Sequence, residues 1–178
     1  ITGTEDGGAF LVFNYLNDDF YLRLGMQRFT AQGEPMWSEA DYSFIPINDP
    51  DELDDADLID VVEFSDGSIF ILTKTWNTDS FKGHRVSLDG SILWDDPVII
   101  CPDDNRRVTA KPFGPSMLTV INNGYGGEAD IEGQLISVDG DLLWGDEPLL
   151  ILSQDYDILR QNIAVAVTDD LHFWMVYQ

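Results

Sequence analysis

Residues 133–144 read Gly-Gln-Leu-Ile-Ser-Val-Asp-Gly-Asp-Leu-Leu-Trp, and a closely similar stretch occurs twice earlier in the chain. Residues 83–94 read Gly-His-Arg-Val-Ser-Leu-Asp-Gly-Ser-Ile-Leu-Trp, and residues 25–37 read Gly-Met-Gln-Arg-Phe-Thr-Ala-Gln-Gly-Glu-Pro-Met-Trp. In each stretch a Trp follows the turn glycine by four residues. Self-similarity at a period of about fifty residues indicates a solenoid, a propeller or another repeat array.

Each stretch predicts a β-hairpin. Asp89-Gly90 and Asp139-Gly140 stand between short β-rich runs. An Asp-Gly pair in this setting is the strongest local hairpin signal, because a two-residue type I′ turn needs positive φ at both central residues. Gln32-Gly33 is a weaker member of the set. The three Trp residues recur with the turns, so we expect Trp37, Trp94 and Trp144 to be packing residues.

A second hairpin precedes each of these, and a further copy of it occupies residues 163–177, so the unit is a meander of four strands. The turns of these hairpins are Asp6-Gly7-Gly8, Ser65-Asp66-Gly67, Gly114-Pro115 and Thr168-Asp169-Asp170. No segment shows a convincing helical period. The best helical candidate, residues 51–59, is short and acidic, and we interpret it as a loop with at most one helical turn.

The sequence therefore predicts an all-β fold, and within that class a β-propeller built of four-stranded antiparallel meander blades. We place blade 1 at residues 1–47, blade 2 at 58–101, blade 3 at 108–152 and a half blade at 163–178. Apolar strands with little alternation, such as 69–72 and 164–167, fit a sheet that is covered on both faces. A β-sandwich is the competing architecture, but it does not require near-identical hairpins at one spacing.

The stretches Leu88-Asp89-Gly90-Ser91-Ile92-Leu93-Trp94 and Val138–Gly145 resemble the blade repeats of secreted bacterial propeller proteins. Many such proteins in the Bacteroidetes are exported by the type IX pathway. The resemblance implies an extracellular or cell-surface protein. Quinoprotein-type repeats share a similar Gly-x-x-x-Trp, but the chain is short for such a ring.

The strand count predicts about three and a half blades, whereas closed propellers usually have at least four. Three explanations are open. The chain is part of a longer polypeptide, which we favour, or it closes through a homo-oligomer, or its last unit caps an open array.

A meander blade places its connections on two faces. The loop face carries the connections between second and third strands and those between successive blades. The turn face carries the tight turns, such as 65–67 and 89–90. The longer, acidic connections of the loop face leave room for a binding site.

The ligand-binding candidates are aromatic and acidic residues in or next to the connections between second and third strands: Tyr15, Asp18, Trp76, Asp79, Tyr125 and Asp130. Aromatic rings beside carboxylates bind sugars or cations. The alternative is that the aromatic residues pack between blades.

Metal and catalytic motifs are weak in this sequence. Asp49, Asp51, Asp54 and Asp55 are calcium candidates, but they form no Asp-x-Asp-x-Asp-Gly loop, and a solvated acidic loop is favoured. The sequence therefore predicts no cofactor, with calcium as the alternative. Cys101 is interpreted as a small buried hydrophobe. His84 and His172 fall on predicted strands, where structural roles are expected.

The formal net charge is −24, from 33 acidic and 9 basic residues. Nucleic-acid binding needs a cationic surface and is not expected. No apolar run is long enough for a membrane span. The leading hypothesis is a non-catalytic secreted or cell-surface module for protein or glycan binding or for structural assembly. The alternative is a carbohydrate-active enzyme, such as a glycoside hydrolase, on a propeller scaffold, an analogy from fold alone.

Overall fold

A computed structural model describes residues 1–4, 6–16, 18, 22–37, 45–46, 56–75, 80–102, 106–123, 130–153, 163–169 and 172–177. All regular structure in these residues is β-strand, which confirms the all-β prediction. The strands are β1 (Thr2–Gly3), β2 (Ala9–Leu16), β3 (Leu22–Phe29), β4 (Ile45–Pro46), β5 (Ala56–Glu63), β6 (Ile69–Thr75), β7 (Ser80–Val86), β8 (Val98–Cys101), β9 (Arg107–Phe113), β10 (Ser116–Asn123), β11 (Asp130–Ile136), β12 (Leu149–Leu152), β13 (Ile163–Asp169) and β14 (His172–Tyr177).

The strands form three four-stranded sheets and one two-stranded sheet. Their orders are β1-β2-β3-β4, β5-β6-β7-β8, β9-β10-β11-β12 and β13-β14, so each sheet pairs its strands in chain order. Every pairing is antiparallel. The predicted unit of two consecutive hairpins is therefore present three times, and its first half is present a fourth time. We call these sheets 1 to 4.

The hairpins of the repeated stretch have the same closing geometry in all three complete sheets. In sheet 2 the Ser87 amide donates to the Ser91 carbonyl, and the Gly90 amide donates to the Ser87 carbonyl. Gly90 has φ +92°, in the left-handed region that favours glycine. The Asp-Gly pair thus closes a three-residue loop with one left-handed glycine, in place of the expected two-residue type I′ turn.

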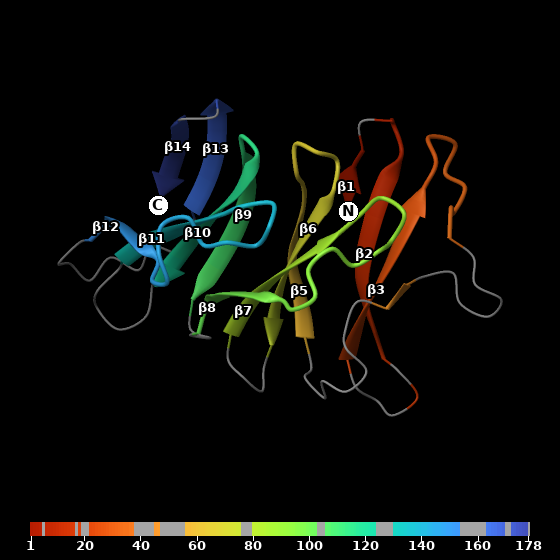
Figure 1. Cartoon of the computed structure of the whole chain (residues 1–178), viewed down its shortest axis with the longest axis horizontal. Coiled ribbons are helices and arrows are strands. Elements are labelled where there is room, and N and C mark those ends of the chain that lie inside the picture. The colour runs from red at the N-terminus through yellow and green to blue at the C-terminus, as the bar shows by residue number, and fades with distance from the viewer. Residues whose placement is uncertain are drawn as a thin grey trace.

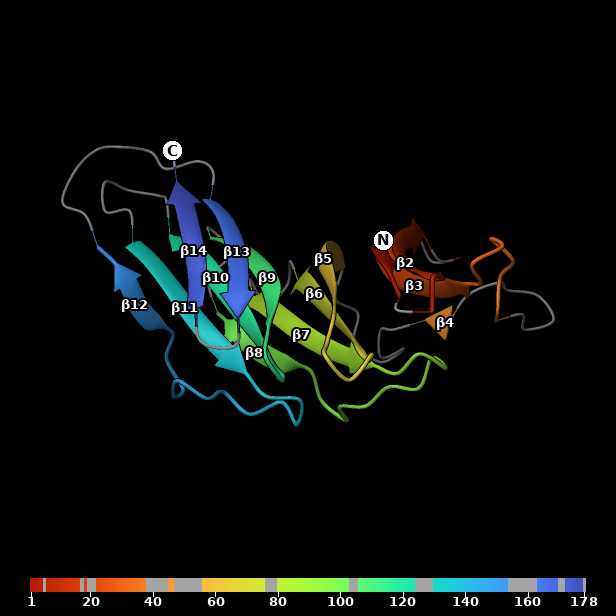
Figure 2. The ribbon, with the colours of Figure 1, turned by 90° about the horizontal axis from the view of Figure 1, so that it is seen from above.

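Sheets 1 to 3 follow one another in chain order along the long axis of the molecule, and the half sheet lies against sheet 3 (Figures 1 and 2). Three apolar clusters fill the space between them. One joins sheets 1 and 2 through Phe10, Met26 and Ile71, and another joins sheets 2 and 3 through Phe70, Trp94 and Met117. The third joins sheet 3 to the half sheet and is formed by Leu118, Val120, Ile131 and Val165 with half-buried neighbours. Sheets 2 and 3 are therefore covered on both faces, which confirms the prediction for strand 69–72. The same prediction for strand 164–167 is wrong, because Ala164 and Ala166 are exposed.

The first strands of consecutive sheets lie next to one another. β5 contacts both β1 and β9, and β9 contacts β13. At the junction of β5 and β9 the Asp60 carboxylate accepts hydrogen bonds from the Ala110 amide (3.2 Å) and the Thr109 hydroxyl (3.4 Å). The side of the stack that carries the first strands is thus held by polar as well as apolar contacts.

Residues 56–59 were interpreted as part of an acidic loop, but they belong to β5, because Ala56 is buried against sheet 1 and pairs with Thr75. Residues 51–55 lie outside the described residues. None of the described segments forms a helix of the length and apolarity needed to cross a membrane.

Candidate functional site

Three of the six predicted ligand-binding residues lie in the described part of the chain. Tyr15 is the penultimate residue of β2 and is half-buried, with its ring centroid 6.4 Å from that of Phe13. Asp18 is exposed just after β2. Asp130 opens β11 and pairs with Asn123. Trp76, Asp79 and Tyr125 lie outside the described residues, as do the calcium candidates Asp49, Asp51, Asp54 and Asp55.

The structure does not bring the three described candidates into one site. Tyr15 and Asp18 belong to sheet 1 and Asp130 to sheet 3, with sheet 2 stacked between them. All three lie at strand ends that lead into the connections between second and third strands. The Asp130 Oδ1 atom is buried and has no hydrogen-bond partner among the described residues. No group of three or more His, Cys, Asp or Glu side chains within the described ranges is placed to hold a metal ion.

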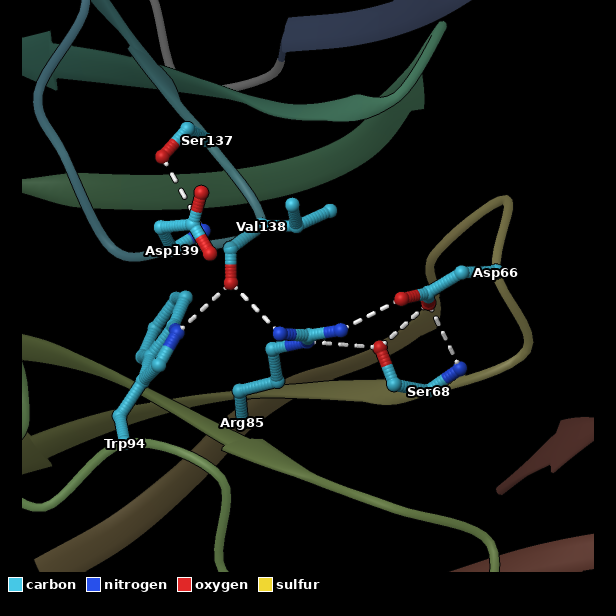
Figure 3. Close-up of polar contacts among 7 residues, drawn as sticks. All are labelled: Asp66, Ser68, Arg85, Trp94, Ser137, Val138 and Asp139. Carbon is cyan, nitrogen blue, oxygen red and sulfur yellow. Dashed lines mark hydrogen bonds and ion pairs between the residues drawn. The ribbon is translucent and has the colours of Figure 1, made fainter.

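The best-defined polar cluster lies instead on the turn face, between sheets 2 and 3, and is centred on Arg85 (Figure 3). The Arg85 guanidinium donates to Asp66 Oδ2 at 2.5 Å and to Ser68 Oγ at 2.8 Å, both in the first hairpin of its own sheet. Its third contact is the backbone carbonyl of Val138, at 2.6 Å, in the second hairpin of sheet 3. The Trp94 indole donates to the same carbonyl at 2.9 Å.

The same arrangement joins sheets 1 and 2. The Arg28 guanidinium binds Asp6 Oδ2 at 2.5 Å and the backbone carbonyl of Leu88 at 3.1 Å. Leu88 and Val138 are each the residue before the Asp-Gly pair of their hairpin. We call this contact, with Arg28 or Arg85 at its centre, the arginine clamp. The clamp shows that the first turn of one sheet and the second turn of the next lie together on the turn face, as the meander predicted.

The aspartate of each clamp is held in its charged form. Burial raises the pKa of Asp66, but hydrogen bonds from Ser68 and the nearby positive charge of Arg85 outweigh it, so the pKa lies below its usual value. Asp6 accepts hydrogen bonds from the Thr4 hydroxyl and the Gly8 amide, and these, with the Arg28 charge, lower its pKa. The clamp is therefore a charged pair at neutral pH.

The junction between sheet 3 and the half sheet has no clamp among the described residues. Leu135 stands where Arg28 and Arg85 stand in the other sheets, and the first turn is Gly114-Pro115 without an aspartate. Phe113 packs there against Phe173, with ring centroids 6.2 Å apart. Arginine and aspartate are thus present together in two sheets and absent together in the third.

The arginine clamp was not predicted from the sequence, although a signal for it was present. Arginine stands two residues before the Ser or Thr that opens the second turn in sheets 1 and 2, and only those sheets have Asp-Gly in their first turn. A comparison of the repeats with one another would have paired these positions. The three repeated Trp residues pack in the inter-sheet clusters, as predicted.

A second repeated polar position lies next to the clamp residue. Gln27 and Gln134 are buried, and each amide bridges the strand to the segment that carries the repeated Trp. Gln27 donates to the Trp37 carbonyl at 2.7 Å and accepts from the Trp37 amide, and Gln134 makes the matching contacts with the Gly145 carbonyl and the Trp144 amide. These contacts fix the Trp backbone against the third strand of its sheet.

His84 takes the place of this glutamine in sheet 2. Its Nε2 atom lies 3.1 Å from the Thr73 hydroxyl. Burial and the positive charge of Lys82 lower the pKa of the imidazole to about 4, so His84 is neutral at physiological pH. His84 lies on β7 and His172 on β14, as predicted. Cys101 is buried, as expected.

Comparison with models of protein families, with curated proteins and with solved structures gave no match to this chain. The internal repeat and its contacts are therefore the evidence on which a function is proposed.

Proposed function

We propose that the chain is a segment of a β-propeller that acts as a non-catalytic binding or scaffold module, secreted or displayed at the cell surface. The observation that carries the proposal is the stacking of consecutive meander sheets through equivalent contacts. The arginine clamp repeats at two junctions, and the first strands lie next to one another from sheet to sheet. In a propeller the first strands of successive blades surround one axis.

The turn face is occupied by internal contacts, which favours the opposite face for ligands. Asp66, Ser68 and Arg85 bind one another, and Arg85 also binds the neighbouring sheet. The loop face carries the end of β2, with Tyr15, and the start of β11, with the buried Oδ1 of Asp130, which has no partner in the described part of the chain. We therefore propose the loop face as the ligand surface, with a glycan or a protein as the ligand. The extracellular location rests on the resemblance of the repeat to secreted propeller proteins.

Small-angle X-ray scattering of the 178-residue chain tests the propeller geometry. We expect the profile of a curved stack in which β5, β9 and β13 lie on the inner side. A profile that fits only a straight stack of sheets would contradict the propeller and favour a solenoid.

Glycan-array and peptide-array screening tests the binding function. We expect a ligand whose affinity falls in the Tyr15→Ala and Trp76→Ala variants. The control is Ile92→Ala, which removes an exposed side chain beside the second turn of sheet 2, on the turn face, and should leave the affinity unchanged. Hydrolysis of a bound glycan would contradict the non-catalytic part of the proposal.

A further inference from the structure

The half sheet exposes one apolar face. Ala164 and Ala166 of β13 lie opposite Val176 and Trp174 of β14, and all four are exposed. Trp174 is 70% exposed and Val176 is 68% exposed. We call these four residues the terminal face. The alternate residues of β14, Phe173 and Met175, pack against sheet 3.

The second strands of the complete sheets show what covers the equivalent positions. In β6, Ile69 and Ile71 pack against the preceding sheet, whereas Phe70 and Leu72 pack against the following one. The side chains directed toward the following sheet are buried in all three sheets: Phe10 0%, Val12 3%, Phe70 0%, Leu72 0%, Leu118 1% and Val120 2% exposed. Trp174 and Val176 continue this series, because Phe173 and Met175 take the opposite face.

The pairing of β14 also differs from that of the second strands in the complete sheets. β2, β6 and β10 each pair with the first strand of their sheet on one side and with the third strand on the other. Within the described ranges β14 pairs only with β13. An edge strand offers a row of backbone donors and acceptors that another strand can pair with. The missing partner is therefore a third strand followed by a fourth.

The large aromatic at Trp174 restricts the sequence of that partner. In sheet 2 the ring of Phe70, the equivalent of Trp174, lies over Gly83 of the third strand. A Cβ added at Gly83 would lie 2.6 Å from Phe70 Cε2 and 2.8 Å from Cζ, closer than real contacts allow. Gly83 pairs with Leu72, the equivalent of Val176. Sheet 3 also has glycine at this position, Gly133 opposite Val120, whereas sheet 1 has Met26 opposite Val12. The packing in sheet 2 therefore favours glycine opposite Val176.

We propose that the terminal face and the free edge of β14 bind a β-hairpin with the third- and fourth-strand chemistry of this repeat, supplied by a protein segment outside residues 1–178. The hairpin carries glycine opposite Val176, an Asp-Gly turn and a Trp four residues after the turn glycine. This inference rests on the proposed propeller stacking and adds the chemical identity of one partner to it.

A labelled synthetic peptide with the sequence of residues 80–100 is the probe, because it contains Gly83, Asp89-Gly90 and Trp94. We expect saturable binding to the 178-residue chain by fluorescence polarisation, and slower hydrogen exchange at the amides of β14 that point away from β13. The matched peptide with Gly83→Val should bind more weakly. Affinity for the Trp174→Ala chain should fall at least about tenfold, whereas Leu143→Ala, at a residue 50% exposed elsewhere in the chain, should leave it unchanged.

Absence of binding, equal binding of the Gly83→Val peptide, or equal affinity for the Trp174→Ala chain would each overturn the inference. Sedimentation of the chain alone tests a second copy as the occupant. If the chain is a dimer and the Trp174→Ala variant is a monomer, the occupant of the terminal face is a second copy of the chain and not the hairpin. A curved scattering profile together with no peptide binding would retain the proposed propeller and remove only this partner.

Discussion

At the scale of single residues, polar side chains inside the stack decide how neighbouring sheets are joined. Arg85 has three partners, and one of them is a backbone carbonyl of the next sheet. A backbone acceptor requires no particular side chain at Val138, so the arginine and its aspartate carry the sequence information of the clamp. Loss of the arginine leaves the Asp66 carboxylate without its charged partner. It also removes one of the two donors to the Val138 carbonyl.

Replacing Arg85 by methionine should lower the free energy of unfolding by about 1–3 kcal/mol, because charge-assisted hydrogen bonds are lost at a partly buried site. Arg85→Lys should recover only part of this, since a single ammonium group cannot reproduce the planar fork that reaches both sheets. Urea denaturation at neutral pH measures both variants. Stability equal to that of the unmodified chain in Arg85→Met would show that the clamp is not stabilising.

His84 should make stability depend on pH. Its pKa is about 4 in the folded chain against 6.5 for an ordinary histidine, so the unfolded chain binds more protons between these values. The stability is complete above about pH 6.5 and falls as the pH decreases toward 4, by at most about 3 kcal/mol.

The variant His84→Gln installs the residue found at this position in sheets 1 and 3 and should remove this part of the pH dependence. Urea denaturation at pH 7 and pH 5 measures the difference, and the chemical shift of the imidazole reports its pKa directly. An NMR titration of His84 with a midpoint near 6.5 would contradict the assignment.

At the scale of elements, each sheet combines a turn that local sequence determines with a surface that the next sheet determines. The left-handed glycines of the second hairpins show both effects. Gly33 has φ +83° and open space where a Cβ would lie. Gly140 has φ +92°, and a Cβ there would lie 3.2 Å from Val98 Cγ2 and 3.4 Å from Trp94 Cε2 in the preceding sheet. One position is restricted by its backbone alone, the other also by packing between sheets.

The pair Gly33→Ala and Gly140→Ala separates these two effects. Gly33→Ala should cost about 1 kcal/mol, the strain of a left-handed alanine. Gly140→Ala should cost more, by about a further 1 kcal/mol, because Trp94 and Val98 must move. Chemical denaturation of both variants gives the difference. Equal losses would mean that the junction of sheets 2 and 3 adapts to an added methyl group without cost.

At the scale of the whole molecule, a net charge of −24 acts against the packing of the stacked sheets. Like charges on a compact chain repel one another, and salt screens the repulsion over about 10 Å at 0.1 M. The described ion pairs are few and local, so screening of the overall repulsion should exceed the weakening of these pairs. The acidic stretch 49–57 contains the calcium candidates, so calcium binding can be tested through the stability of the whole molecule.

Sodium chloride should therefore raise the midpoint of thermal unfolding between low salt and about 0.3 M. At matched ionic strength we expect calcium and magnesium to give the same midpoint, as a solvated acidic loop predicts. Differential scanning calorimetry measures both series. A shift specific to calcium would support a site among Asp49, Asp51, Asp54 and Asp55, and its loss in Asp51→Asn would place it.

Local signals in the sequence determined the strands, the hairpins and the four-stranded unit, because Asp-Gly turns and β-rich runs act within a few residues of chain. The repeated Trp residues were recognisable as packing residues for the same reason. The arginine clamp, the strand assignment of residues 56–59 and the exposure of Trp174 depended on the tertiary structure. Arg85 reaches residue 138, more than fifty positions away. Ala56 enters a strand because sheet 1 covers it. Trp174 resembles the buried Phe70 in sequence, and only the stack of sheets shows that its side chain is exposed.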